Sequence, residues 1–126
     1  MSDIEKYTVR EKEVRFYDLT FTDQNGVQIT KASMSALDLS LFLKDSNPLA
    51  YINSRNAQNV FDLNNVTIDS AGKITWAIQT ADLAIQNANN QVETHIAIFH
   101  LTTSGGTSIQ VRKEIYFYVD NLEPVS

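Results

Sequence analysis

Two stretches near the C-terminus decide the fold: residues 92–102 read VETHIAIFHLT, and residues 107–119 read TSIQVRKEIYFYV. Both are rich in β-branched and aromatic residues, and Ser104-Gly105-Gly106 lies between them, which predicts a long β-hairpin. The second stretch alternates with the period of a strand that has one buried face. Its apolar set is Ile109, Val111, Ile115, Phe117 and Val119, and its other set is Gln110, Arg112, Glu114, Tyr116 and Tyr118. Lys113 interrupts the apolar set and predicts a bulge or an edge position.

The rest of the chain shows the same alternation between turn signals. Strands are expected at 14–21, 27–29, 37–43, 65–69, 73–79 and, more briefly, near 50–52 and 60–62. Turns are expected at 23–26, which reads DQNG, and at 69–72. Thr80 as an N-cap predicts a short helical turn near 80–86. About seven strands and no long helix predict an all-β fold, an immunoglobulin-like β-sandwich.

The length of 126 residues is that of one domain. We expect an N-terminal arm at 1–13, the β-sandwich domain at 14–120 and a C-terminal tail at 121–126. The arm mixes acidic and basic residues, and its charged start is unlike a signal peptide. No apolar run approaches the roughly 18 residues that a membrane span needs, so no membrane partner is expected.

Composition excludes several kinds of chemistry. The chain has no cysteine, which removes disulfides, a thiol nucleophile and cysteine-based metal sites. A net charge of −5 argues against binding to nucleic acid, which needs a basic stripe. His95 and His100 are the two histidines, and their odd spacing puts them on opposite faces of one strand. The sequence therefore predicts no enzyme: no catalytic residue, no cofactor and no metal site.

The aromatic residues separate into two groups. Trp76 falls on the inward face of its strand and is expected in the core, although a tryptophan can also stack on a sugar. Phe42, Tyr116 and Tyr118 fall on the outward faces, where amphipathic aromatic residues are compatible with a protein interface. Coverage of these three by the other sheet or by a loop is the alternative. They are the candidate interface residues.

Several segments together resemble the immunoglobulin-like β-sandwich modules of tailed-bacteriophage structural proteins, above all those of baseplates and tails. The likeness rests on LTFTDQNGVQI (19–29), LDLSLFL (37–43), DSAGKITWAIQTADLA (69–84) and the aromatic hairpin. Those modules share a D-x-x-G-x-[VI]-x-[YWF] hairpin followed by a short helical turn with an Ala-Asp pair. The matching residues are Asp69, Gly72, Ile74, Trp76 and Ala81-Asp82. The Gly-x-Tyr that often precedes the penultimate strand is replaced here by NANNQVETH (87–95).

This resemblance implies a bacteriophage virion structural protein: a tail, baseplate, neck or head-decoration subunit acting through protein–protein contacts. Its partners would be other virion proteins and a second copy of itself, and it would be assembled in the host cytoplasm. Such modules commonly precede a larger receptor-binding or fibre region, and because this chain ends at Ser126 a stand-alone subunit is expected. Two alternatives are a non-catalytic glycan-binding module, suggested by Trp76, the tyrosines and the Asn-rich loops, and a small enzyme.

Overall fold

The computed structural model describes residues 4–23, 25–104 and 110–121. Within them the helical elements are two short 3-10 turns, η1 (Lys31–Ser33) and η2 (Thr80–Leu83). The expected all-β class is therefore confirmed. The strands of the described part are β1 (Ile4–Arg10), β2 (Arg15–Leu19), β3 (Met34–Leu43), β4 (Gln58–Asn59), β5 (Val66–Ile68), β6 (Ile74–Ile78), β7 (Val92–Thr103) and β8 (Gln110–Asp120).

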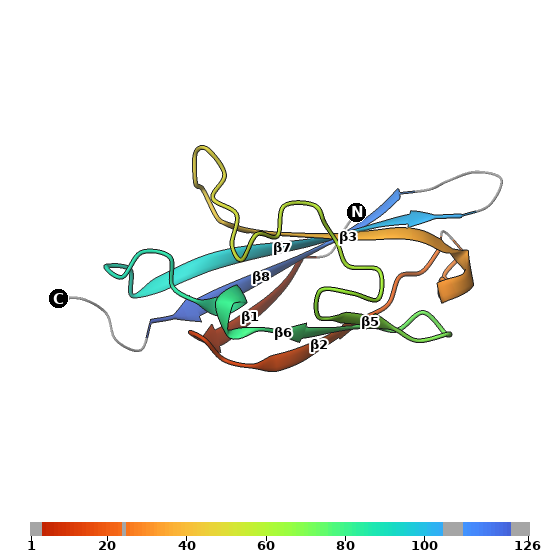
Figure 1. The fold of residues 1–126 in the computed structure, drawn as a ribbon, viewed down its shortest axis with the longest axis horizontal. Coiled ribbons are helices and arrows are strands. Elements are labelled where there is room, and N and C mark those ends of the chain that lie inside the picture. Colours follow the sequence, from red (N-terminus) through yellow and green to blue (C-terminus); the bar gives the residue numbers. More distant parts are fainter. Residues whose placement is uncertain (1–3, 24, 105–109, 122–126) are drawn as a thin grey trace.

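The strands form two sheets that stack as the layers of a β-sandwich (Figure 1). One sheet has five strands in the order β1-β8-β7-β3-β4, and the other has three in the order β2-β6-β5. β1 runs parallel to β8, and the other paired strands run antiparallel. Since side chains alternate along a strand, each sheet turns every second residue toward the other sheet.

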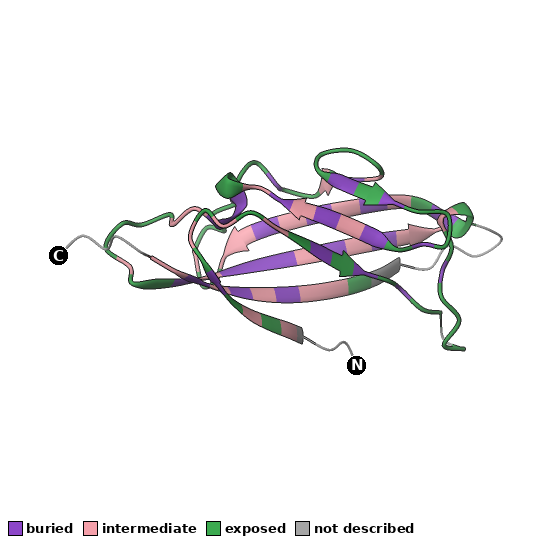
Figure 2. Cartoon of the chain, turned by 90° about the horizontal axis from the view of Figure 1, so that it is seen from below, coloured by how far each residue is buried: buried purple, intermediate pink, exposed green. Residues whose placement is uncertain are grey.

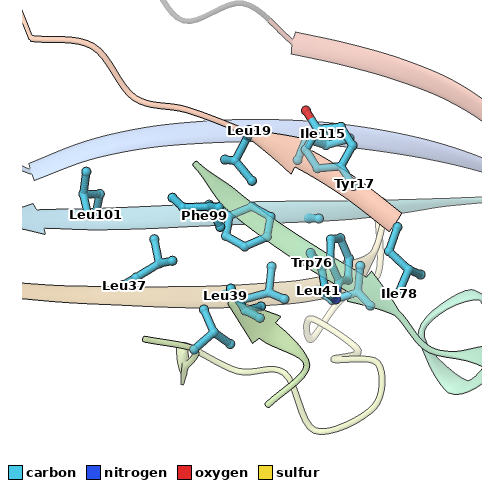
Figure 3. Packing of buried hydrophobic residues seen from close by; sticks show 14 of the residues in the cluster. Tyr17, Leu19, Leu37, Leu39, Leu41, Trp76, Ile78, Phe99, Leu101 and Ile115 are labelled. Atoms are coloured by element: carbon cyan, nitrogen blue, oxygen red, sulfur yellow. The ribbon is translucent and has the colours of Figure 1, made fainter. Parts of the chain in front are cut away.

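The core fills the space between the sheets. Burial alternates along the strands with a period of two (Figure 2). Trp76 is fully buried and meets Phe99 edge to face, with ring centroids 5.5 Å apart (Figure 3). The ring of Phe117 also meets Trp76 edge to face, at 5.9 Å. The predicted inward positions are confirmed: Leu37, Leu39 and Leu41 of β3 and Ile74 and Ile78 of β6 are also fully buried.

The C-terminal hairpin is confirmed as two long paired strands. β7 and β8 pair without a register shift from Val92 with Asp120 to Thr102 with Gln110. The bulge expected at Lys113 is therefore absent from this register. Lys113 instead lies opposite Phe99, and its Nζ is 3.6 Å from Glu5 Oε1. The turn glycines 105 and 106 and Ile109 lie outside the described residues.

Some segments differ from the sequence-based expectation. Most of the expected arm forms β1, which pairs with β8 from Ile4 to Arg10, so the sheet begins well before residue 14. Residues 27–29 give a single bridge, Thr22 with Gln28, and no strand. The strand expected at 60–62 lies earlier, as β4, while residue 51 bridges to β3. The pieces near residues 51 and 58–59 are held by hydrogen bonds to β3, whereas residues 27–29 bond to residues 21–23.

The helical turn after β6 is also shorter and capped differently. It ends at Leu83 instead of residue 86, and its N-cap is Gln79, not Thr80. The backbone N–H of Gln79 donates to Oδ2 of Asp82 at 2.8 Å, which closes a capping box. Asp82 is fully buried, so this turn carries a carboxylate into the interior.

Candidate protein interface

The candidate site is the outer face of the five-stranded sheet, which turns away from the three-stranded sheet (Figure 1). We define this outer face by the side chains that pairing and alternation place there. They are Lys6 and Thr8 of β1, Arg112, Glu114, Tyr116 and Tyr118 of β8, Thr94, Ile96, Ile98 and His100 of β7, Asp38, Ser40 and Phe42 of β3, and the adjoining Lys44 and Tyr51. β7 is the middle strand of the five, with two strands on either side.

An apolar row crosses this face from one edge toward the other. Strand register places Lys6, Tyr116, Ile96 and Phe42 side by side. Tyr51 continues the row, because it bridges to Phe42 and its ring meets the Phe42 ring edge to face at 6.1 Å. Ile96 is 7% exposed although it faces outward, since aromatic neighbours flank it on both sides. Tyr51 is 39% exposed and Phe42 and Tyr116 are half-buried, so the row still offers apolar surface.

The next row combines a tyrosine with a lysine. Thr8, Tyr118 and Thr94 lie in register, and the backbone N–H of Lys44 donates to the carbonyl of Thr94 at 2.9 Å. The hydrogen bond and charge of Asp45 raise the pKa of Lys44, and the nearby hydroxyls of Tyr116 and Tyr118 act in the same direction. The Lys44 ammonium is therefore a cation at neutral pH beside the tyrosine pair.

Charged residues of both signs lie farther along the face. Arg112, His100 and Asp38 lie in register across β8, β7 and β3. The Nη2 of Arg112 donates to Oε1 of Glu114 at 2.7 Å on the same strand. Among the described residues, Asp38 has no ion-pair partner. The outer face is thus an apolar centre with a polar surround, the anatomy of a protein interface.

The three candidate residues predicted from the sequence share this face as expected. Phe42 and Tyr116 lie in the same row with Ile96 between them, and Tyr118 lies in the next row. They lie on the side of the five-stranded sheet that faces away from the three-stranded sheet, and Tyr51 contacts the ring of Phe42. Sequence reasoning missed the contributions of Tyr51 and Lys44, because alternation assigns a residue to a face without saying which strands are neighbours.

A second cluster of polar side chains lies inside the sandwich and was not predicted. We call Arg55, Asp82, Glu93 and His95 the buried polar cluster, since each is at most 3% exposed. Arg55 donates to both oxygens of Asp82 from Nε at 2.6 Å and Nη2 at 3.2 Å. It also donates to the Gln58 side chain, to the Asn64 carbonyl and to the Asn65 side chain, and it stacks over the Trp76 ring at 5.6 Å.

The other half of the buried polar cluster joins β7 to two loops. His95 places Nδ1 3.2 Å from the carbonyl oxygen of Asp82 and Nε2 2.9 Å from Oε1 of Glu93. Glu93 also accepts hydrogen bonds from the backbone of Gln86 and Asn87 and from the Asn90 side chain. Burial by itself raises the pKa of Glu93, but these hydrogen bonds, with that of His95, outweigh it and lower the pKa.

The buried polar cluster is closed to solvent and its side chains hydrogen-bond to one another in two pairs, so we assign it a structural role. His95 faces inward and is fully buried, while His100 lies on the outer face, which confirms that the two histidines lie on opposite faces. Among the described residues, no group of three His, Asp or Glu side chains is placed to hold a metal ion. No helix in the described ranges is long and apolar enough to cross a membrane.

Trp76 cannot stack on a sugar in this fold because its side chain is fully buried. The glycan-binding alternative thereby loses its tryptophan. Neither models of protein families nor curated protein sequences match this chain. The functional argument therefore rests on the outer face of the sheet.

Proposed function

We propose that this protein is a bacteriophage structural subunit of the tail, baseplate, neck or head decoration, and that it acts in the virion through protein–protein contacts made by the outer face. The observation that carries the proposal is the half-exposed apolar row Tyr116–Ile96–Phe42–Tyr51. Apolar side chains in an open row gain stability when a partner covers them, by about 25 cal/mol per Å² before the costs of association.

The strand order supports the immunoglobulin-like part of the proposal. Counting β2 as strand B, the sheet β2-β6-β5 has the order B-E-D, and β8-β7-β3 has the order G-F-C. β4 then takes the place of strand C′ beside C. Asp69, Gly72, Ile74 and Trp76, which carry the resemblance to the phage modules, occupy one hairpin of the smaller sheet and its core.

A non-catalytic role is part of the proposal. The charged side chains inside the sandwich are paired in the buried polar cluster, and those on the outer face surround an apolar row. Catalysis by such groups requires an acid or base beside an accessible cavity, and the members of the buried polar cluster are at most 3% exposed. Contact with another macromolecule is what the outer face supports best.

Mass spectrometry of purified phage particles whose genome encodes this chain tests the proposal. We expect the protein in the particles, assembled in the host cytoplasm with other virion proteins. Replacement of Tyr116 and Tyr118 by Ser should lower its incorporation, and Phe16→Ser is the matched control. Phe16 is 71% exposed on β2 of the other sheet, so its loss should leave incorporation unchanged. Absence of the protein from the particles would make the proposed function wrong.

A further inference from the structure

The outer face is complementary to itself across its middle strand. In the row through Ile96, Tyr116 lies on the β8 side of β7 and Phe42 on the β3 side. In the row through His100, Arg112 lies on the β8 side and Asp38 on the β3 side. In the row through Thr94, Tyr118 lies opposite Lys44. Each of these three rows therefore carries a group on one side of β7 that suits the group on its other side.

We propose that this outer face binds a second copy of the same chain, face to face, about a two-fold axis parallel to β7. The proposal deepens the proposed function, on which it rests, by naming the partner. Rotation about such an axis keeps every residue in its row and exchanges the two sides of β7. A closed dimer with one self-complementary surface is the commonest symmetric assembly.

The rotation brings different groups together on the two sides of β7 in each of these rows, and each β7 side chain faces the same side chain of the second copy. Tyr116 of one copy lies over Phe42 of the other, and Ile96 lies over Ile96 of the second copy. Arg112 lies over Asp38, which has no ion-pair partner among the described residues of its own copy. Lys44 lies over Tyr118, and Lys6 lies over Tyr51, where an ammonium can contact an aromatic face.

The size of the face also suits a dimer. Four strands about 4.8 Å apart and eight residues of about 3.4 Å each give a flat area of roughly 520 Å², which Tyr51 and the two-residue β4 extend. Side-chain relief adds to the accessible area, which brings one copy near the ~800 Å² per partner of a standard interface. A two-fold axis perpendicular to the strands fits less well. It would exchange the rows through Ile96 and Ile98, so that Glu114 of one copy would lie over Tyr116 of the other and Ser40 over Phe42.

Charge exchange between Arg112 and Asp38 tests the proposal by sedimentation equilibrium. Arg112→Glu and Asp38→Arg each put like charges at two places in a homodimer, so each should raise the dimer dissociation constant by about tenfold or more. In a mixture of the two variants, every such contact again joins opposite charges. We therefore expect the mixed dimer to recover the wild-type dissociation constant. That recovery also shows that both variants fold.

Phe16→Ser is the control, because Phe16 lies on the three-stranded sheet and not on the proposed interface. This variant should dimerise as the wild type does. Wild-type protein that stays monomeric up to about 1 mM overturns the proposal. Failure of the mixture to recover overturns it as well. An axis across the strands would instead place Asp38 of one copy over Lys44 of the other. If Asp38→Arg forms dimers when mixed with Lys44→Glu, but not when mixed with Arg112→Glu, the axis runs across the strands and the proposed geometry is wrong. A monomer that is nevertheless found in virions would leave the proposed function standing without the dimer.

Discussion

Arg55 and Asp82 form a two-pronged ion pair inside the sandwich, with Nε 2.6 Å from Oδ1 and Nη2 3.2 Å from Oδ2. The pair fastens the irregular segment between β3 and β5 to the turn η2 that follows β6. Asp82 also accepts hydrogen bonds from the Asn53 side chain and the Gln79 backbone. The Asp82 carboxylate thus hydrogen-bonds both to the segment that carries Asn53 and Arg55 and to its own turn η2.

Removal of the guanidinium should cost much of the stability of the fold. Arg55→Met leaves the Asp82 carboxylate buried without its cation, and broken buried pairs of this kind cost about 3–5 kcal/mol. Urea unfolding at neutral pH measures the loss as a lower midpoint with an unchanged slope. Arg15→Ala is the control, because Arg15 pairs with Glu13 at the surface and such pairs are worth about 1 kcal/mol or less. Equal losses in the two variants would contradict this role of Arg55.

Glu93 should make the stability of the protein depend on pH in the acid range. Its folded pKa is lower than its ordinary value of 4.5, because the bonds from Gln86, His95, Asn87 and Asn90 outweigh the effect of burial. As the pH falls below the ordinary value, the unfolded chain binds a proton before the folded protein does. The stability that Glu93 contributes is therefore fully present above that value and is lost as the pH falls through the folded pKa.

Unfolding free energies measured at a series of pH values check this prediction. Glu93→Gln should be less stable than the wild type at neutral pH, and the difference should shrink as the solution is acidified. Glu13→Gln removes a surface carboxylate and retains Glu93, so it should follow the wild-type dependence. A gap between Glu93→Gln and the wild type that stays constant from neutral to acid pH would contradict the assignment.

The alternation of apolar and polar residues predicted most strands of the sandwich, because each main strand buries one of its two faces. The leucines of β3 and the set Ile74, Trp76 and Ile78 of β6 are such cases, and all are buried as expected except the half-buried Leu43. β1 escaped prediction because Glu5 interrupts the inward set Tyr7 and Val9, and because its pairing with β8 is non-local. β4 is only Gln58–Asn59, which carries no strand pattern.

The candidate site was predicted in part for a similar reason. Alternation along each strand placed Phe42, Tyr116 and Tyr118 on outward faces. Only the order of the strands in the sheet shows that these three residues share one surface. Tyr51 joined them through a bridge in an irregular segment, where the sequence shows no period. The Arg55–Asp82 pair spans 27 residues and joins an irregular polar segment to the helical turn, so no local pattern indicated it.

Gly72 should tolerate no side chain. Its φ of +99° lies in the region that suits glycine, and a Cβ there would overlap the carbonyl oxygen of Ile29. Gly72→Ala therefore adds a clash with backbone to a conformational cost of about 1–3 kcal/mol. Gly26 is the matched control, with φ of +79° and nothing within 4 Å of a Cβ. Thermal unfolding should show a larger fall in Tm for Gly72→Ala than for Gly26→Ala, and equal falls would contradict the close approach to Ile29.

Neighbouring residues of β8 should separate the needs of the fold from those of assembly. Phe117 is 1% exposed and packs between Trp76 and Tyr7, so Phe117→Ala should cost about 3–5 kcal/mol through the cavity it leaves. Tyr116 and Tyr118 flank it on the half-exposed outer face. Replacement of either by Ala should cost well under half as much, because solvent already reaches these rings. Urea unfolding at low protein concentration measures the monomer in each case. A loss at Tyr116 or Tyr118 as large as that at Phe117 would show that the outer face serves the fold itself and would remove the basis for a docking surface.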